Sequence, residues 1–236
     1  MGRRQREIVL TVELHAHSEM SYDGRDPVEM LLAQASAIGL DALVITDHDE
    51  FAASREAADL APEYDLIGIT GMEVTSAAGH VLAIGIEKQV PAGLPFTETI
   101  DAIHDRGGIA IVPHPFQKSR SGVAPNVSTE ALRRADALEV YNSRLLTGRS
   151  NRRAERFARK YDIPMTAGSD AHIAELVGQA VTLVDADEPT ADSVLDAIRT
   201  GQTTVEGKRT PWRISFRQAA GGVKRRIKNR LSDALG

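Results

Sequence analysis

Hydrophobic and polar positions follow two alternating periods along the chain. Short runs with a period of two, typical of strands, are separated by longer segments with the period of a helix. Residues 8–14 show the first pattern, with Leu10 and Val12 on one face of the predicted strand. The period continues into His15 and His17, so we expect both imidazoles to point to the same side.

The same alternation predicts the remaining elements. A helix is predicted to begin at Asp26 and Pro27, a capping residue followed by a first-turn proline, and to end at Gly39. Further strands are predicted at residues 41–46, 66–70 (followed by the segment 72–74), 80–86, 109–112, 137–141, 163–167 and 181–184. Further helices are predicted at about 50–60 and 148–160, from Thr97 to Gly107, from Ser128, and from Thr190 through Ile198.

Strands separated by helices favour parallel βα units. At least seven such strands in about 205 residues fit a closed barrel better than an open sheet. We expect residues 1–207 to form this domain. The sequence shows no internal repeat and no low-complexity segment.

Charge separates this domain from a C-terminal extension, residues 208–236. Residues 1–207 hold 19 basic and 32 acidic residues, whereas the extension holds nine basic residues and one acidic residue. Its Val223, Ile227 and Leu231 repeat every four residues, which predicts a basic amphipathic helix. We favour a helix packed on the acidic domain, and the alternatives are contact with a membrane surface or with nucleic acid.

The amino-acid composition limits the kinds of cross-link and metal ligand that the chain can form. The chain of 236 residues contains no cysteine, which excludes disulfides and leaves any metal to His, Asp and Glu. No apolar run approaches the roughly 20 residues that span a bilayer. The charged N-terminus has no apolar core behind it, so we expect no secretory signal and a cytoplasmic protein.

Six of the seven histidines fall in five short motifs, most of which follow a predicted strand. A single histidine at a strand end is more often a surface residue, but five motifs together favour a metal site at one edge of parallel strands. Histidine and carboxylate donors without sulfur suit Zn, Mn, Fe or Co better than Ca. His104, the seventh, is expected to be an exposed helix residue.

The order of these motifs resembles the PHP (polymerase and histidinol phosphatase) superfamily over about residues 8–206. The motifs are Leu14-His-Ala-His-Ser18, Ser21-Tyr-Asp-Gly24, Ile45-Thr-Asp-His48, Gly71-Met-Glu73, Gly79-His80-Val-Leu, Pro113-His-Pro115 and Gly168-Ser-Asp-Ala-His172. The resemblance implies a distorted (βα)7 barrel of parallel strands. It also implies two or three divalent metal ions in a cleft at the carboxyl ends of these strands.

The resemblance also implies a ligand set. The first metal would take His15, His17, Glu73 and Asp170. The second would share Glu73 and add His80 and His114, and the third would take Asp23, His48 and His172. Some members place His at the position of Asp23, and the spacing that leads to His80 varies. Glu13 and Asp47 are either residues that orient ligand histidines or ordinary polar residues at strand ends.

Clustered divalent ions make hydroxide available near neutral pH and neutralise phosphate oxygens. The chain has no cysteine nucleophile, nucleophile elbow or phosphate-binding P-loop, so direct attack by metal-bound hydroxide is the simplest mechanism. Glu73, Asp170 and His172 are expected at its catalytic centre. Candidate residues to hold the substrate phosphate are Lys118, Arg120 and Arg144, with a solvated basic loop as the alternative.

These features predict a metal-dependent phosphoesterase acting on a small phosphate ester, either a nucleotide or a phosphorylated metabolite. A nuclease is the first alternative, and the acidic domain disfavours it because nucleic-acid enzymes normally present a basic surface. A metal-binding regulatory module without catalysis is the second, and the intact ligand set disfavours it.

Overall fold

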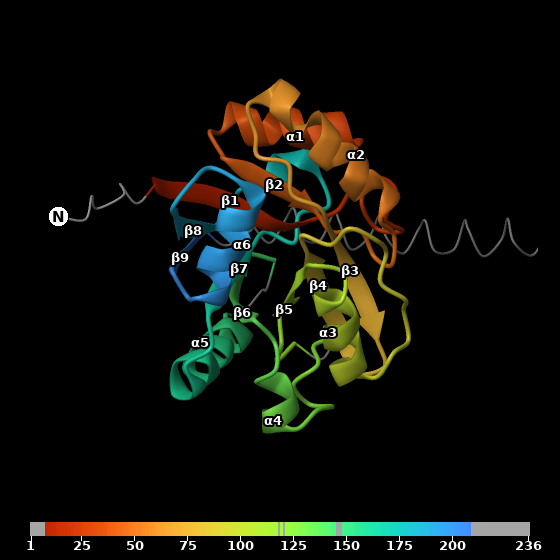
Figure 1. Cartoon of the computed structure of the whole chain (residues 1–236), viewed down its shortest axis with the longest axis vertical. Helices are drawn as coiled ribbons and strands as arrows, with labels where there is room; N and C mark the ends of the chain where they lie inside the picture. The colour runs from red at the N-terminus through yellow and green to blue at the C-terminus, as the bar shows by residue number, and fades with distance from the viewer. Residues whose placement is uncertain (1–7, 118, 120, 145–147, 209–236) are drawn as a thin grey trace, which may run out of the picture.

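Two mixed β-sheets form the centre of the molecule (Figure 1). The computed structural model describes residues 8–117, 119, 121–144 and 148–208. One sheet has the strand order β2-β1-β8-β9, and the other has the order β3-β4-β5-β6-β7. The strands are β1 (Ile8–Ala16), β2 (Ala42–Ile45), β3 (Gly71–Ser76), β4 (Gly79–Ile84), β5 (Ile109–Val112), β6 (Ala137–Asn142), β7 (Met165–Gly168), β8 (Ala180–Ala186) and β9 (Thr203–Gly207).

Six helices pack against these sheets in the described part of the chain. They are α1 (Val28–Ala37), α2 (Ala52–Leu60), α3 (Phe96–His104), α4 (Thr129–Leu132), α5 (Arg149–Tyr161) and α6 (Ala191–Arg199). Short 3₁₀ helices lie at Ala61–Tyr64 and Ala174–Leu176. In Figure 1, α1 and α2 lie together at one end of the molecule, and α3, α4 and α5 lie toward the other.

The expectation of a (βα)7 barrel of parallel strands is wrong. Four of the neighbouring strand pairs are antiparallel, namely β1 with β8, β8 with β9, β3 with β4, and β4 with β5. Across the described residues no continuous backbone ladder joins the two sheets, and the pairing outside them is limited to isolated bridges such as Ala16 with Ala171 and His48 with Glu73. A parallel pair needs a long crossover, and only β1–β2, β5–β6 and β6–β7 combine a crossover helix with a parallel ladder.

Two local differences explain part of this error. Residues 66–70, predicted as a strand, join the sheet only through a bridge at Ile67. Gly68 packs so closely on α2 that an added Cβ would lie 2.2 Å from the carbonyl oxygen of Ala58. This segment therefore packs along the helix and does not extend a strand. The strand begins instead at Gly71 and turns back after Ser76 into β4, which makes a tight antiparallel hairpin.

Three apolar clusters hold the layers together. The first lies between the two sheets and α6, and includes Val12, Ile84 and Ile198. The second joins the five-stranded sheet to α3, α4 and α5. The third packs α1 and α2 on β1 and β2. These layers fix the strand ends at which the predicted ligands lie.

Several predicted helix ends agree with the structure. The side chain of Ser128 caps α4, and that of Thr190 caps α6. Asp26 does not cap α1, because its carboxylate accepts a hydrogen bond from the backbone of Ala174 at 2.7 Å. The predicted C-terminal amphipathic helix lies outside the described residues. Within the described residues, no helix combines the length and the apolar character needed to cross a membrane.

We expect Ile84→Ala to lower the free energy of unfolding by about 2–5 kcal/mol, because the fully buried side chain fills the space between the sheets. Met30→Ala is the control. That side chain is 53% exposed on α1, and its loss should change stability by less than about 0.5 kcal/mol. Denaturant unfolding measures both, and equal effects would contradict the packing described here.

Candidate metal centre

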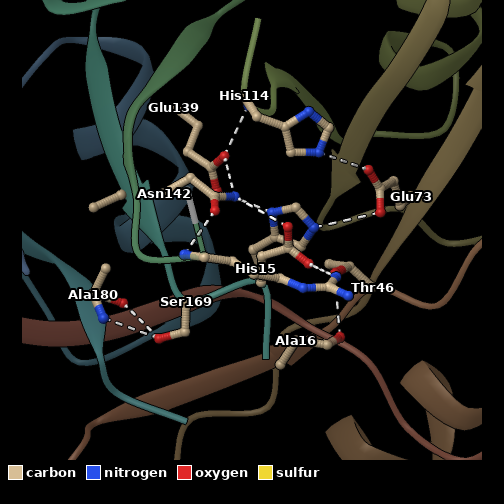
Figure 2. A network of polar contacts seen from close by, with 12 residues as sticks. His15, Ala16, Thr46, Glu73, His114, Glu139, Asn142, Ser169 and Ala180 are labelled. Atoms are coloured by element: carbon tan, nitrogen blue, oxygen red, sulfur yellow. Dashed lines mark hydrogen bonds and ion pairs between the residues drawn. The ribbon is translucent and has the colours of Figure 1, made fainter. Parts of the chain in front are cut away.

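The carboxylate of Glu73, buried on β3, lies among five histidines, two of which, His15 and His114, are shown beside it in Figure 2. Its Oε2 atom lies 3.3 Å from His15 Nε2, 3.4 Å from His17 Nε2 and 3.3 Å from His48 Nδ1. Its Oε1 atom lies 2.7 Å from His80 Nδ1 and 3.4 Å from His114 Nε2. The structure therefore brings five of the other eight predicted ligands around the carboxylate of Glu73.

Backbone pairing sets the positions of these groups. Glu73 and His80 lie on the two arms of the β3–β4 hairpin, so their separation is fixed locally. The segment after β2 is pinned to β3, since the Glu73 amide donates to the Asp47 carbonyl and the Asp49 amide donates to the Glu73 carbonyl. This pairing places His48 beside Glu73.

The other three predicted ligands lie at the adjoining end of the centre. Asp23 Oδ2 is 2.7 Å from His172 Nε2 and 3.7 Å from His48 Nε2. Asp170 Oδ1 is 3.4 Å from His172 Nδ1 and 3.9 Å from His17 Nε2. All nine residues thus form one continuous cluster.

Arg144, predicted to hold a substrate phosphate, lies directly against this end. Its Nη1 atom lies 2.9 Å from Asp170 Oδ1 and 2.7 Å from His172 Nε2. Its backbone amide donates to the side chain of Asn142. The two other phosphate candidates, Lys118 and Arg120, lie outside the described residues.

The cluster fits divalent cations. Four triads have ligand atoms within 4.8 Å of one another: His15, His17 and Asp170; His15, Glu73 and His114; His17, Asp23 and His172; His17, His48 and Glu73. Buried ring nitrogens of His17 and His114 have no hydrogen-bond partner among the described residues. Unsatisfied buried nitrogens beside carboxylates are costly unless a cation engages them.

The tautomers of two histidines support the same conclusion. His15 Nδ1 donates to the Glu139 carboxylate at 2.9 Å, so in the neutral ring Nε2 carries a lone pair that faces Glu73. His172 Nδ1 donates to the carbonyl of Asp170 at 2.8 Å, so its Nε2 lone pair faces Asp23. A ring nitrogen that faces a carboxylate needs either a shared proton or a cation between the two groups, and a divalent ion would meet this need.

Burial and charge shift the pKa values of these groups in opposite directions. Burial alone would raise the pKa of Glu73, but His48, His15 and His80 hold it well below its usual range. Burial alone would lower the pKa of His15, yet the carboxylates of Glu139 and Glu73 hold it well above the usual value. Burial, with His172 and His48 beside it, lowers the pKa of His17 well below normal.

Glu139 is a buried part of the centre that the sequence analysis missed (Figure 2). Its Oε1 atom accepts from His15, and its Oε2 atom accepts from the backbone of His114 at 2.8 Å and from Asn142 Nδ2 at 2.9 Å. The signal was an acidic residue inside the apolar strand at 137–141. Glu139 therefore joins β1, β5 and the end of β6.

Glu13 and Asp47 act on the backbone around the centre. Glu13 accepts from the amides of His15, Ser169 and Gly178, and burial raises its pKa to about 7. Asp47 accepts from the amide and hydroxyl of Ser18, and burial raises its pKa to about 6. Their carboxylates thus hold loops in place and do not orient imidazole rings through the described hydrogen bonds.

Local backbone geometry is strained at two predicted ligands. His114 has φ of 32° and Asp170 has φ of 51°, which non-glycine residues rarely adopt. Gly168 is required for a different reason, since a Cβ there would lie 2.5 Å from both Glu139 Oε1 and His15 Cβ. His104, by contrast, is exposed at the end of α3 as expected, and it contacts Asp136.

The fold and the cluster together define an α/β protein with a His and carboxylate centre suited to divalent metals. A family model described as PHP-associated matches residues 148–203. The chain is 30% identical over 176 residues to an uncharacterised protein of Methanocaldococcus jannaschii, an alignment that covers 72% of this chain and 69% of that protein. The chain belongs to the PHP superfamily, as its motifs predicted.

Three further comparisons describe the range of relatives. Over 86 residues, 34% of this chain and 32% of the relative, the chain is 35% identical to phosphoribosyl 1,2-cyclic phosphate 1,2-diphosphodiesterase of Eggerthella lenta. A two-domain Bacteroides vulgatus protein that contains a predicted PHP-like metal-dependent phosphoesterase has a similar fold, with a TM-score of 0.71 and 19% identity. The match covers 88% of this chain and 70% of that protein. A lesion-specific endonuclease of Pyrococcus furiosus also has a similar fold, with a TM-score of 0.61 and 16% identity. The match covers 84% of this chain and 58% of the endonuclease chain.

We expect Glu139→Gln to weaken metal binding by about 10–100-fold, because an amide cannot accept from His15, His114 and Asn142 together. Competition against a chromophoric chelator measures the affinity without reference to activity. Glu130→Gln, an exposed change on α4, should leave it unaltered. Equal metal affinities in Glu139→Gln and the wild type would remove Glu139 from this role.

Proposed function

We propose that this protein hydrolyses a phosphate ester at the cluster around Glu73. It is a hydrolase that acts on phosphoester bonds, the class to which its relatives' names refer. The observation that carries the proposal is the contact of one buried carboxylate with five imidazoles, since such a donor set suits two or three Zn, Mn or Fe ions. Bound divalent ions would supply hydroxide near neutral pH and neutralise phosphate oxygens.

The nine proposed ligands would hold up to three ions. His15, His17, Glu73 and Asp170 would hold the first ion, and Glu73 would bridge to a second held by His80 and His114. Asp23, His48 and His172 would hold a third. Glu139 fixes the tautomer of His15, which keeps its Nε2 atom available as a ligand.

Arg144 is proposed to hold the substrate phosphate. Its guanidinium is mostly buried, with 13% of the side chain exposed, and already faces the anionic end of the centre. An arginine in this position can donate two parallel hydrogen bonds to a phosphate. It would thereby orient the ester toward Glu73 and Asp170.

Two candidate functions differ in the class of phosphate ester that the protein would hydrolyse. A small phosphate ester, such as a nucleotide or a phosphorylated metabolite, agrees with the excess of acidic residues in residues 1–207. A nuclease is the second candidate, and one observation favours it: α5, which carries exposed basic residues, begins beside Asn142, whose side chain contacts Asp170. A non-catalytic regulatory module would be expected to have lost metal ligands, whereas all nine residues proposed as ligands are present in this sequence.

We expect Glu73→Gln to abolish metal-dependent turnover, because an amide cannot bridge two cations as a carboxylate does. The measurement is a screen of mononucleotides, sugar phosphates, histidinol phosphate and short oligonucleotides, with Mn and Zn compared and with chelator added. Glu63→Gln, an exposed change, is the matched control and should retain full activity. Retained turnover in Glu73→Gln, or a trapped phosphorylated residue, would contradict the mechanism.

Arg144→Ala should lower kcat/KM by about 10–100-fold, since it removes a charge-assisted contact worth about 1.5–3 kcal/mol. Arg144→Lys should restore only part of the loss because lysine lacks the planar fork. Arg134→Ala removes an exposed arginine paired with Asp101 and serves as the control. If kcat/KM is unchanged in Arg144→Ala, Arg144 does not contact the substrate.

A further inference from the structure

Helix α5 concentrates positive charge on an otherwise acidic domain. It holds six of the 19 basic residues of residues 1–207 and one acidic residue, Glu155. The six are exposed side chains on 13 residues of helix: Arg149, Arg152, Arg153, Arg156, Arg159 and Lys160. We call this surface the α5 basic face.

Most of this charge is not neutralised. Among the described residues, only Arg159 of the six has a carboxylate partner, the Glu155 side chain at 2.9 Å on the next turn. Uncompensated like charges on neighbouring turns destabilise a helix by a few tenths of a kcal/mol per pair. A polyanion bound along the helix would remove this repulsion.

Aromatic rings lie between the cations. A hollow of about 390 Å³ is lined by Phe116 and Phe157 together with Arg153, Arg156 and Lys160, among others. The Arg153 guanidinium lies over the Phe116 ring, 4.4 Å from its centroid. Cations interleaved with aromatic rings suit single-stranded nucleic acid, because the cations contact phosphates while the rings stack on bases.

The first turn of α5 lies close to the metal centre. Phe116 follows His114 by two residues. At the start of α5, Ser150 donates to Gln117, and Asn151 accepts from the backbone of Asn142, whose side chain contacts Asp170. A strand lying along α5 would therefore lead directly to the cluster around Glu73.

We propose that the α5 basic face binds a short single-stranded nucleic acid, whose end enters the metal centre. The span from Arg149 to Lys160 is about 16 Å at 1.5 Å per residue, enough for only a few phosphates. Beyond this helix the acidic domain repels a longer strand. The orientation of the strand rests on the proposed phosphoesterase function, whereas binding itself does not.

The test measures binding of a fluorescein-labelled six-residue oligodeoxythymidylate by anisotropy, with chelator present so that no turnover occurs. Arg153→Gln with Arg156→Gln should weaken binding about 10-fold at 50 mM NaCl. The slope of log affinity against log salt should fall by about 1.4, or 0.7 for each lost phosphate contact. Arg55→Gln with Lys88→Gln, the same charge change away from α5, should bind like the wild type.

Three outcomes would overturn the proposal: no oligonucleotide binding by the wild type, equal binding by the α5 variant, or α5-dependent binding of phosphatidylglycerol vesicles in place of the oligonucleotide. Hydrolysis of bis(p-nitrophenyl) phosphate by the wild type, measured separately, tests the proposed function alone. Binding through α5 without hydrolysis of this diester or of any phosphate ester in the screen described above would leave this inference standing and remove the proposed function.

Discussion

A carboxylate held in the interior among imidazoles is unstable unless positive charge is supplied, and Glu73 is such a group. Burial opposes its ionisation, while His48, His15 and His80 favour it strongly enough to keep the pKa well below the usual range. The surrounding histidines face the opposite problem, since the ring nitrogens of the buried His17 have no hydrogen-bond partner among the described residues. The arrangement makes physical sense as a site where cations compensate charges that the protein alone leaves unbalanced.

The scaffold around Glu73 is built to resist this imbalance. The β3–β4 hairpin fixes two of the groups relative to each other, and Glu139 ties three strands to the same point. Glu13 and Asp47 hold the adjoining loops through backbone amides. These supports are buried, and they hydrogen-bond to ligand residues or to the backbone beside them, which is the kind of support that tight and selective metal sites require.

Features carried by local sequence were predictable, and features set by distant pairing were not. The caps at Ser128 and Thr190 depend on neighbouring residues, and the structure has them where the sequence placed them. His48, His114 and His172 likewise follow strands β2, β5 and β7 within a few residues. Strand direction depends on which distant segment pairs with which, so alternating elements were mistaken for a parallel barrel. Glu139 was not predicted because two of its partners, His114 and His15, lie 25 and 124 residues away in the chain.

The participants in the centre extend from His15 to His172 along the chain, a separation that has a thermodynamic consequence for folding. An ion bound there would act as a removable cross-link that closes several long loops at once, and loop closure costs the unfolded chain entropy that grows with loop length. Since ions bind the folded protein far better than the unfolded chain, the free energy of unfolding would increase with ion concentration. The fraction of folded molecules in a cell would then follow the supply of free metal as well as temperature.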